Sequence, residues 1–327
     1  MKRTRMGPGV EFDMIRRFLG SDNSSELPET VRVGPGDDCA VIGGGNLAIS
    51  SDLSIEDVHF RRDWLDPEEI GYRATAGALS DLAAVAARPI GVLAALALHG
   101  RDVDVMAQAI MDGVRSAAVD AGAALIGGDT SRSPGPVVLD VVVVGAAPDP
   151  VLRDGARVGD GVWVTGELGA AAAAVRAWES GAAPRPDARA AFARPQPRLR
   201  EAQWLAERRV MHALIDLSDG LTGDAGHIAA ASGVHIAIDG SALPVHAAAR
   251  AAGGDQAHLL ALGGGEDYEL CFTADDAVVL AVADAFSTRF GVRLTRVGVV
   301  GEGSGVSIDG RDEAAAGGYD HFAGGGT

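Results

Sequence analysis

Four acidic clusters follow short apolar runs, and this pattern constrains the fold more than any other feature of the sequence. The clusters are Gly36-Asp37-Asp38, Ser50-Ser51-Asp52, Gly127-Gly128-Asp129 and Asp216-Leu217-Ser218-Asp219-Gly220. A short apolar run predicts a buried strand, so each cluster is expected where a strand ends and a loop begins. Loops at strand ends are where α/β proteins bind ligands. Because gathered carboxylates repel each other, we expect Mg²⁺ and a bound polyphosphate at these clusters.

The size and composition predict a large protein with an aliphatic core. The chain has 327 residues, of which 47% are apolar and only 5% aromatic. No apolar run reaches the roughly 18 residues of a membrane span, and no apolar signal core follows the basic start of the chain. The two cysteines, Cys39 and Cys271, lie in apolar runs without paired spacing. We therefore expect a cytoplasmic protein without a disulfide or zinc site.

The charge pattern excludes some partners and some ATP-binding mechanisms. A formal net charge of −17 argues against nucleic acid or an anionic membrane as partner, because both need basic patches. Lys2 is the only lysine, so the P-loop lysine and the protein-kinase strand lysine are both absent. If the protein binds ATP, metal ions and arginines must neutralise the phosphates.

Strand and helix patterns mix along both halves of the chain, which predicts an α/β or α+β fold in two domains. A composition break at residues 146–150 places the boundary between domains 1–147 and 148–327. The expected elements include a hairpin of 39–42 with 47–51, a helix from Asp66 to about Ala87, a strand at 92–98, and strands 123–126 and 137–145 around a loop. Asp66 is a suitable N-cap, and Pro67 suits the first helical turn.

Each acidic cluster, taken alone, also has an ordinary structural interpretation. Turns are rich in Gly, Pro and Asp, and Ser218 or Asp219 could simply cap a helix. Asp81 lies inside an Ala-rich helix, so its side chain faces either solvent or a site. One Asp caps a helix, whereas two Asp and a Ser exceed what a cap needs. The joint occurrence of the clusters favours a shared site.

Seven segments in the same order resemble the thiamine-monophosphate kinases. They are GPGDDCAVI (34–42), ISSDLSIEDVHF (49–60), LSDLAAVAA (79–87), LIGGDTSR (125–132), LIDLSDGLTGDAGHIAAA (214–231), GGEDYELCF (264–272) and GYDHF (318–322). This family belongs to a superfamily with aminoimidazole ribonucleotide synthetase and selenophosphate synthetase, whose ATP sites lack a Walker loop. That property is consistent with the missing lysine.

The resemblance implies a set of site residues. The implied Mg²⁺ ligands are Asp38, Ser51, Asp52, Asp81, Asp129, Asp216 and Asp219, with Ser50 beside them. The implied ATP contacts are Asp112, Gly128, Asp129, Arg153 and Ser218. The implied contacts to thiamine phosphate are His59 and Glu266, and the family's C-terminal aromatic contact falls near Tyr319. The sequence departs from the family at Ala316 and Gly317, the closest positions upstream of that tyrosine, and at Ala78, where the family often has Asn.

The resemblance also implies a fold, a reaction and an assembly. The implied fold is an aminoimidazole ribonucleotide synthetase-like pair of α/β domains, with ATP between the domains and a homodimer formed by the N-terminal domains. The implied reaction is Mg²⁺-assisted transfer of phosphate from ATP to thiamine monophosphate, the final step of thiamine diphosphate biosynthesis. Other hypotheses are a different ATP-using synthetase of the superfamily, a metallohydrolase, or a non-catalytic protein that binds metal or nucleotide.

Overall fold

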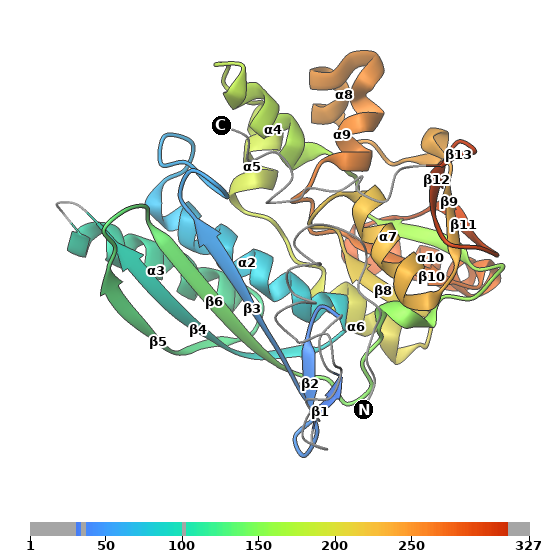
Figure 1. The fold of residues 1–327 in the computed structure, drawn as a ribbon, viewed down its shortest axis with the longest axis horizontal. Coiled ribbons are helices and arrows are strands. Elements are labelled where there is room, and N and C mark those ends of the chain that lie inside the picture. The colour runs from blue at the N-terminus through green and yellow to red at the C-terminus, as the bar shows by residue number, and fades with distance from the viewer. Residues whose placement is uncertain (1–30, 34–36, 100–102, 313–327) are drawn as a thin grey trace, which may run out of the picture.

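Two mixed β-sheets, each with its own helices, organise the molecule (Figure 1). The structure is a computed structural model that describes residues 31–33, 37–99 and 103–312. The first sheet has the strand order β1-β2-β3-β6-β4-β5, and the second has the order β13-β12-β9-β11-β7-β10-β8. Each contains one parallel pair, β4 with β5 and β12 with β9, among antiparallel pairs. The predicted α/β (α+β) fold with two mixed sheets is confirmed.

The N-terminal elements form a six-stranded sheet with two long helices. They are β1 (Val31–Val33), β2 (Ala40–Ile42), β3 (Leu47–Ile55), α2 (Pro67–Ala84), β4 (Arg88–Leu98), α3 (Val103–Asp120), β5 (Ala124–Arg132) and β6 (Val138–Ala146).

The C-terminal elements form a seven-stranded sheet with shorter helices around it. They are a 3₁₀ turn η1 (Arg153–Gly155), β7 (Gly161–Thr165), α4 (Ala170–Glu179), α5 (Pro186–Ala193), α6 (Leu199–Glu207), β8 (Ala213–Asp216), α7 (Leu221–Ser232), β9 (His235–Ile238), α8 (Ala247–Gly253), α9 (Ala257–Gly263), β10 (Leu270–Ala274), α10 (Asp276–Phe290), β11 (Leu294–Gly301), β12 (Gly305–Ile308) and β13 (Arg311–Asp312).

The local signals for the first hairpin and the first long helix are confirmed. Strands β2 and β3 pair in antiparallel fashion around the turn at residues 43–46. Helix α2 begins after Asp66, whose backbone N–H donates to the Glu69 carboxylate at 3.0 Å. The helix ends at Ala84, three residues before the predicted end, because Ala86 adopts a positive φ of 55°.

Strand β4 begins earlier than predicted and contains a proline. Pro89 lies opposite Gly145 of β6, and the register shifts between Pro89 and Gly91. The pairing of β4 with β5 begins only at Gly91, so Pro89 has a neighbouring strand on one side alone. Proline cannot donate to a strand ladder, so a strand tolerates it best at such a position.

The prediction that every acidic cluster follows the end of a strand is wrong for two clusters. Ser50, Ser51 and Asp52 lie inside β3, which pairs with β6 along its whole length. Gly128 and Asp129 lie inside β5, where a loop was predicted. The close pairing of β5 with β4 requires a glycine at position 128, because a Cβ there would collide with the Ala94 carbonyl oxygen. Both strands continue because their backbone groups have partners in the sheet.

Helices α2 and α3 lie along one face of the N-terminal sheet (Figure 1). Side chains alternate between the two faces of a sheet, so residues paired across strands point to the same side. The row Leu53, Asp140, Ala95 and Asp129 crosses β3, β6, β4 and β5 in register. This row lies on the face away from the helices, and Leu53 is 46% exposed. We call this surface the uncovered face.

An aromatic stack and two ion pairs join α2 and the residues before it to the C-terminal helices. Trp64 stacks on Trp178 of α4 with ring centroids 5.0 Å apart, and Phe192 of α5 packs edge-on against both rings. Nearby, Arg189 donates two hydrogen bonds of 2.7 Å to Glu69. Arg194 lies 2.9 Å from Glu68. These contacts fix α2 against the second domain, which determines how the site is assembled.

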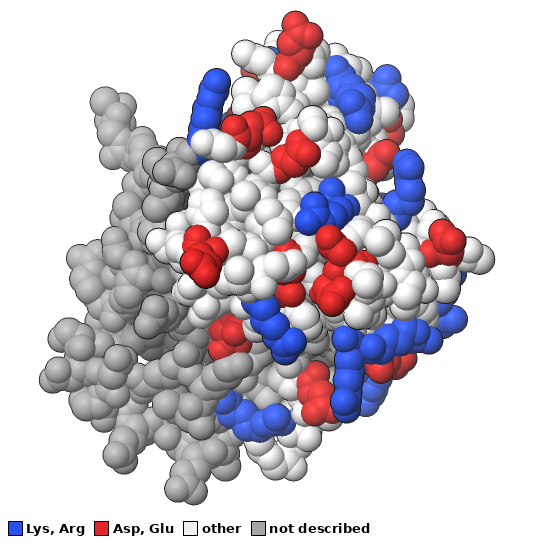
Figure 2. Space-filling view, turned by 90° about the vertical axis from the view of Figure 1, so that its right-hand side faces the viewer, with Lys and Arg blue, Asp and Glu red and all other residues white. Residues whose placement is uncertain are grey.

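The C-terminal face carries charges of both signs. Figure 2 shows Arg side chains interspersed with Asp and Glu over this face, although the whole chain has a net charge of −17. Among the described residues, no helix combines the length and the apolar character that a membrane crossing requires.

Candidate active site

Three carboxylates from distant parts of the chain meet at the junction of the two domains. Asp38 precedes β2, Asp81 lies in α2, and Asp216 is the last residue of β8. One oxygen from each lies within 4.8 Å of the others. The Ser50 hydroxyl donates to Asp81 at 2.5 Å, which places a fourth oxygen at the cluster. Asp81 therefore points into a site rather than toward solvent. We call Asp38, Asp81 and Asp216 the carboxylate triad.

Burial and mutual repulsion make the ionised form of the triad unfavourable without a cation. Burial, with the negative charge of Asp38, raises the pKa of Asp216 to about 7. Burial and the charges of Asp216 and Asp38 raise the pKa of Asp81 as well. The Arg153 guanidinium donates to Asp38 at 2.8 and 2.5 Å and supplies the nearest fixed positive charge. Buried carboxylates and a hydroxyl are hard oxygen donors, so these residues fit Mg²⁺.

A second potential ligand group adjoins the triad at the N-terminal part of α7 and the loop before it. Oxygens of Asp219 and Asp224 and a ring nitrogen of His227 lie within 4.8 Å of one another. The Asp219 N–H donates to Asp224 at 3.2 Å. Burial, followed by the positive charge of Arg153, lowers the pKa of His227 to about 4. The ring is therefore neutral near pH 7.

Sequence reasoning selected Asp219 but missed Asp224 and His227. The available signal was their spacing of three residues, which places both on one face of the helix that follows the Asp216–Gly220 motif.

A third group forms around Glu266, at the glycine-rich turn before β10. The Glu266 carboxylate accepts hydrogen bonds of 2.6 Å from both Arg73 and the Tyr268 hydroxyl. Arg73 also donates to the His59 carbonyl oxygen at 3.1 Å, so the two implied acceptor contacts share one arginine. Burial raises the pKa of Asp52 to about 6, and the negative charge of Glu266 adds to this effect.

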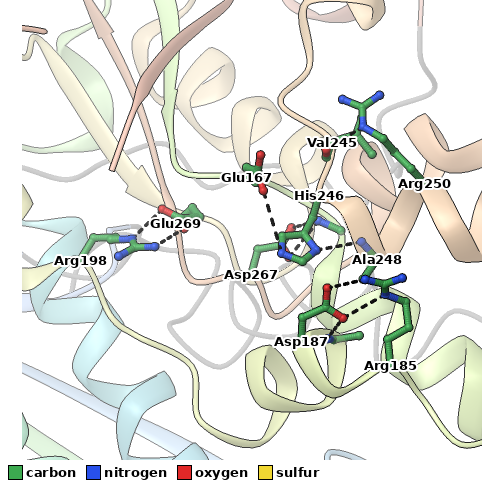
Figure 3. Close-up of polar contacts among 12 residues, drawn as sticks. Glu167, Arg185, Asp187, Arg198, Val245, His246, Ala248, Arg250, Asp267 and Glu269 are labelled. Carbon is green, nitrogen blue, oxygen red and sulfur yellow. Dashed lines mark hydrogen bonds and ion pairs between the residues drawn. The ribbon is translucent and has the colours of Figure 1, made fainter. Parts of the chain in front are cut away.

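A polar cavity of about 450 Å³ opens beside Glu266. Its wall includes Arg194, Arg198 and Arg293 together with His246, Asp267 and Glu269. Figure 3 shows that Arg198 forms an ion pair with Glu269 and that Glu167 faces His246 across this region. Most of these charges are already paired, so the cavity offers hydrogen-bond donors and acceptors rather than a single dominant charge.

The structure places some of the implied residues away from the triad. Asp129 is exposed on the edge strand β5, and Ser51 donates to Asp140 at 2.8 Å on the uncovered face. Asp112 is exposed on α3, where it accepts hydrogen bonds from Gln108 and Arg115. Within this chain, these three residues are therefore not brought together with the triad.

Three further implied residues lie beside the Glu266 group, in the Asp216–Gly220 loop, or outside the described residues. The Ser218 carbonyl accepts the Glu266 N–H at 2.8 Å, which connects the Asp216–Gly220 loop to the Glu266 turn. His59 accepts the Ile55 N–H through Nδ1 at 3.0 Å. Tyr319 lies outside the described residues.

The fold and this site define the class of the protein, and comparison with known proteins agrees. Residues 36–147 match the family described as AIR synthase related protein, N-terminal domain, and residues 157–311 match the corresponding C-terminal domain. The chain is thus a two-domain protein of the AIR-synthase-related class.

Individual relatives narrow the class further. Thiamine-monophosphate kinase of Salmonella typhimurium is 36% identical over 96% of this chain and 98% of its own length. The crystal structure of thiamine-monophosphate kinase from Stenotrophomonas maltophilia K279a is 37% identical with a TM-score of 0.76, over 92% of this chain and 96% of that chain. A structure of AaThiL complexed with AMPPCP and TMP is 29% identical with a TM-score of 0.81, over 96% of this chain and 97% of that chain. The chain belongs to the thiamine-monophosphate kinase family.

Proposed function

We propose that this protein transfers the γ-phosphoryl group of ATP to thiamine monophosphate and so forms thiamine diphosphate. The observation that carries the proposal is the carboxylate triad beside Arg153, at the domain junction that the Arg73–Glu266 hydrogen bond also crosses. Phosphoryl transfer depends mainly on positioning and charge neutralisation, and this junction offers both. The relative solved with AMPPCP, an ATP analogue, together with TMP supports a site for two phosphorylated ligands.

The metal ligands that we propose are eight residues with oxygen donors, seven from the acidic clusters and Asp81 from α2. They are Asp38, Ser50, Ser51, Asp52, Asp81, Asp129, Asp216 and Asp219. These residues would hold several Mg²⁺ ions, whose positive charge would offset the negative charge of the phosphates. Arg153 would add fixed charge on the ATP side, where Asp112, Gly128, Asp129 and Ser218 are the other proposed contacts.

The acceptor needs little help from a general base. The second pKa of a phosphate monoester is about 6, so the attacking oxygen is already largely ionised near neutral pH. We assign the binding site of the acceptor to the cavity beside Glu266. His59 would contact the acceptor from the N-terminal domain, and Tyr319 is the candidate for the aromatic contact. The residues around this cavity would bind and orient the acceptor for in-line transfer.

We further propose a cytoplasmic homodimer that buries the uncovered face. Domain 1–147 would bind ATP and Mg²⁺ and form the dimer, and domain 148–327 would close the cleft. The change from the first sheet, which ends at Ala146, to the second, which begins at Gly161, supports this division. An uncovered sheet face with an open edge strand supports the dimer, because such surfaces otherwise risk non-specific association.

The decisive experiment is incubation with Mg-ATP and thiamine monophosphate, followed by detection of thiamine diphosphate by mass. Asp216→Asn should lower turnover at least about a hundredfold, the scale of losing a strong electrostatic contact. Turnover of another phosphorylated or amide substrate instead would identify a different synthetase. Phosphate release without acceptor would indicate a hydrolase, and the lack of any ADP release would indicate a binding protein.

A further inference from the structure

Arg73 is a buried residue that connects His59 and Glu266, the two implied contacts to the acceptor. It extends from α2, and its side chain is only 5% exposed, whereas the Glu266 side chain is 28% exposed and lines the cavity. Its guanidinium donates to the Glu266 carboxylate at 2.6 Å and to the His59 carbonyl at 3.1 Å. The guanidinium also lies 3.9 Å from the ring centroid of Phe192 in α5. The arginine is thus fixed by contacts from both domains.

The turn that carries Glu266 has an unfavourable backbone. Glu266 and Tyr268 have φ values of 72° and 49°, a region that non-glycine residues rarely occupy. Their N–H groups donate to the carbonyls of Ser218 and Leu217, each at 2.8 Å. Strained backbone of this kind persists only where the surroundings fix it, and it occurs frequently at ligand sites. Here it aims the carboxylate toward Arg73 and the Tyr268 hydroxyl at once.

Resting on the proposed function, we infer that Arg73 and Tyr268 are positioning residues that fix the Glu266 carboxylate for binding of the acceptor. Two donors to one carboxylate oxygen determine both its position and its rotamer. Tyr268 also connects this group to the metal side, because a Cβ added at Gly77 would lie 2.8 Å from the Tyr268 hydroxyl and 3.3 Å from an Asp52 oxygen. The acceptor contact and the proposed metal ligand Asp52 are therefore held against the same stretch of α2.

A purely structural ion pair between the domains is the competing interpretation, and the chain offers a matched control for it. Arg189 also forms two short hydrogen bonds to a glutamate across the same junction, with Glu69 of α2. Neither Arg189 nor Glu69 lines the Glu266 cavity. If Arg73 only joined the domains, Arg73→Lys and Arg189→Lys would have similar effects.

The test measures KM for thiamine monophosphate and for ATP in Arg73→Lys, Tyr268→Phe and Arg189→Lys. Arg73→Lys and Tyr268→Phe should each raise the acceptor KM, by about tenfold for the arginine, the scale of a hydrogen bond to a charged group. The KM for ATP should stay within about twofold, and Arg189→Lys should change neither value by more than that. Thermal unfolding checks folding, and if Arg73→Lys does not fold, Tyr268→Phe decides alone.

A double-mutant cycle with Glu266→Gln separates positioning from general damage. If Arg73 acts through Glu266, Arg73→Lys should change the acceptor KM by less than about twofold in the Glu266→Gln background. Additive effects, or an equal rise in both KM values, would overturn the inference while leaving the reaction in place. If the unaltered protein forms no thiamine diphosphate at all, the proposed function itself has failed.

Discussion

Asp52 and Asp129 point to opposite faces of the same sheet. Asp52 faces α2, close to Gly77, and Asp129 lies on the uncovered face in register with Asp140 and Ala95. Strands β6 and β4 separate β3 from β5, so three strand spacings of about 4.8 Å place the two residues roughly 14 Å apart. A single Mg²⁺, with ligands at about 2.1 Å, cannot bind both carboxylates of one subunit.

This separation gives a complementation prediction. If the dimer brings Asp129 to the site of the other subunit, Asp52→Asn and Asp129→Asn will each be nearly inactive alone. A mixed dimer of the two variants contains one intact site and one doubly altered site. Random mixing should therefore restore about a quarter of the unaltered activity, because half of the dimers are mixed and half of their sites are intact.

The measurement is turnover of a co-expressed, randomly mixed preparation. Each variant expressed alone is the control. Activity no higher than that of the single variants would place both carboxylates in the site of their own subunit, or would exclude a shared role for them.

The family resemblance selected the three members of the triad, but the sequence could not show how they meet. The Asp216–Gly220 motif was correctly placed at the end of a strand, because a short apolar run followed by a helix-capping motif is a local signal. Asp52 and Asp129 were wrongly placed at strand ends, since pairing with β6 and β4 extends β3 and β5 beyond their apolar segments. Strand pairing is a long-range property that a single sequence does not encode locally.

The acceptor side was less predictable still. Glu266 came from the resemblance, but Arg73 lies in an ordinary helical stretch 193 residues earlier, and only the packing of α2 against the second domain brings them together. Asp224 and His227 were missed because their helical spacing is as common in plain amphipathic helices as in ligand sites.

Metal-free protein should lose stability as the pH rises from about 4 to about 7. Folding raises the pKa of Asp52 to about 6 and that of Asp216 to about 7, and it lowers the pKa of His227 to about 4. The two carboxyl groups outweigh the one histidine, so these groups together bind more protons in the native state than in the unfolded state in this window. Stability then falls with increasing pH. Thermal unfolding in EDTA measures this slope, and Asp216→Asn should make it shallower. An unchanged slope in that variant would contradict the assignment.

Magnesium should reverse this trend. Cation binding requires the ionised carboxylates, so the stabilisation by Mg²⁺ should grow as the pH rises toward 7. The measurement is the shift of the unfolding midpoint on adding Mg²⁺ at each pH. The control is Asp276→Asn, which replaces an exposed carboxylate that is paired with Arg296. A shift that does not depend on pH would argue against binding at the buried clusters.

Arg153→Ala should mainly weaken ATP binding. An arginine that contacts phosphate in the ground state contributes uniform binding, so KM for ATP should rise while kcat changes little. The variant should also be less stable without ligands by about 3–5 kcal/mol, since Asp38 keeps a buried charge without its partner. Arg157→Ala, which removes a contact with His212 in the same segment, is the control. A large fall in kcat at unchanged KM would place Arg153 in the transition state instead.

Gly77→Ala should separate activity from stability. Replacing a helical glycine by alanine normally stabilises a helix by about 1 kcal/mol, and Gly77 lies inside α2. The new methyl group would lie 2.8 Å from the Tyr268 hydroxyl and 3.3 Å from an Asp52 oxygen, so one of these side chains must move. We expect turnover to fall by at least about tenfold, the scale on which a small displacement of a reacting group affects rate, while the unfolding midpoint changes little. Gly71→Ala is the contrasting variant, because its methyl group would collide with the Ile110 backbone and should lower stability first. Full activity in Gly77→Ala would show that the contact between Tyr268, Asp52 and α2 does not matter for the reaction.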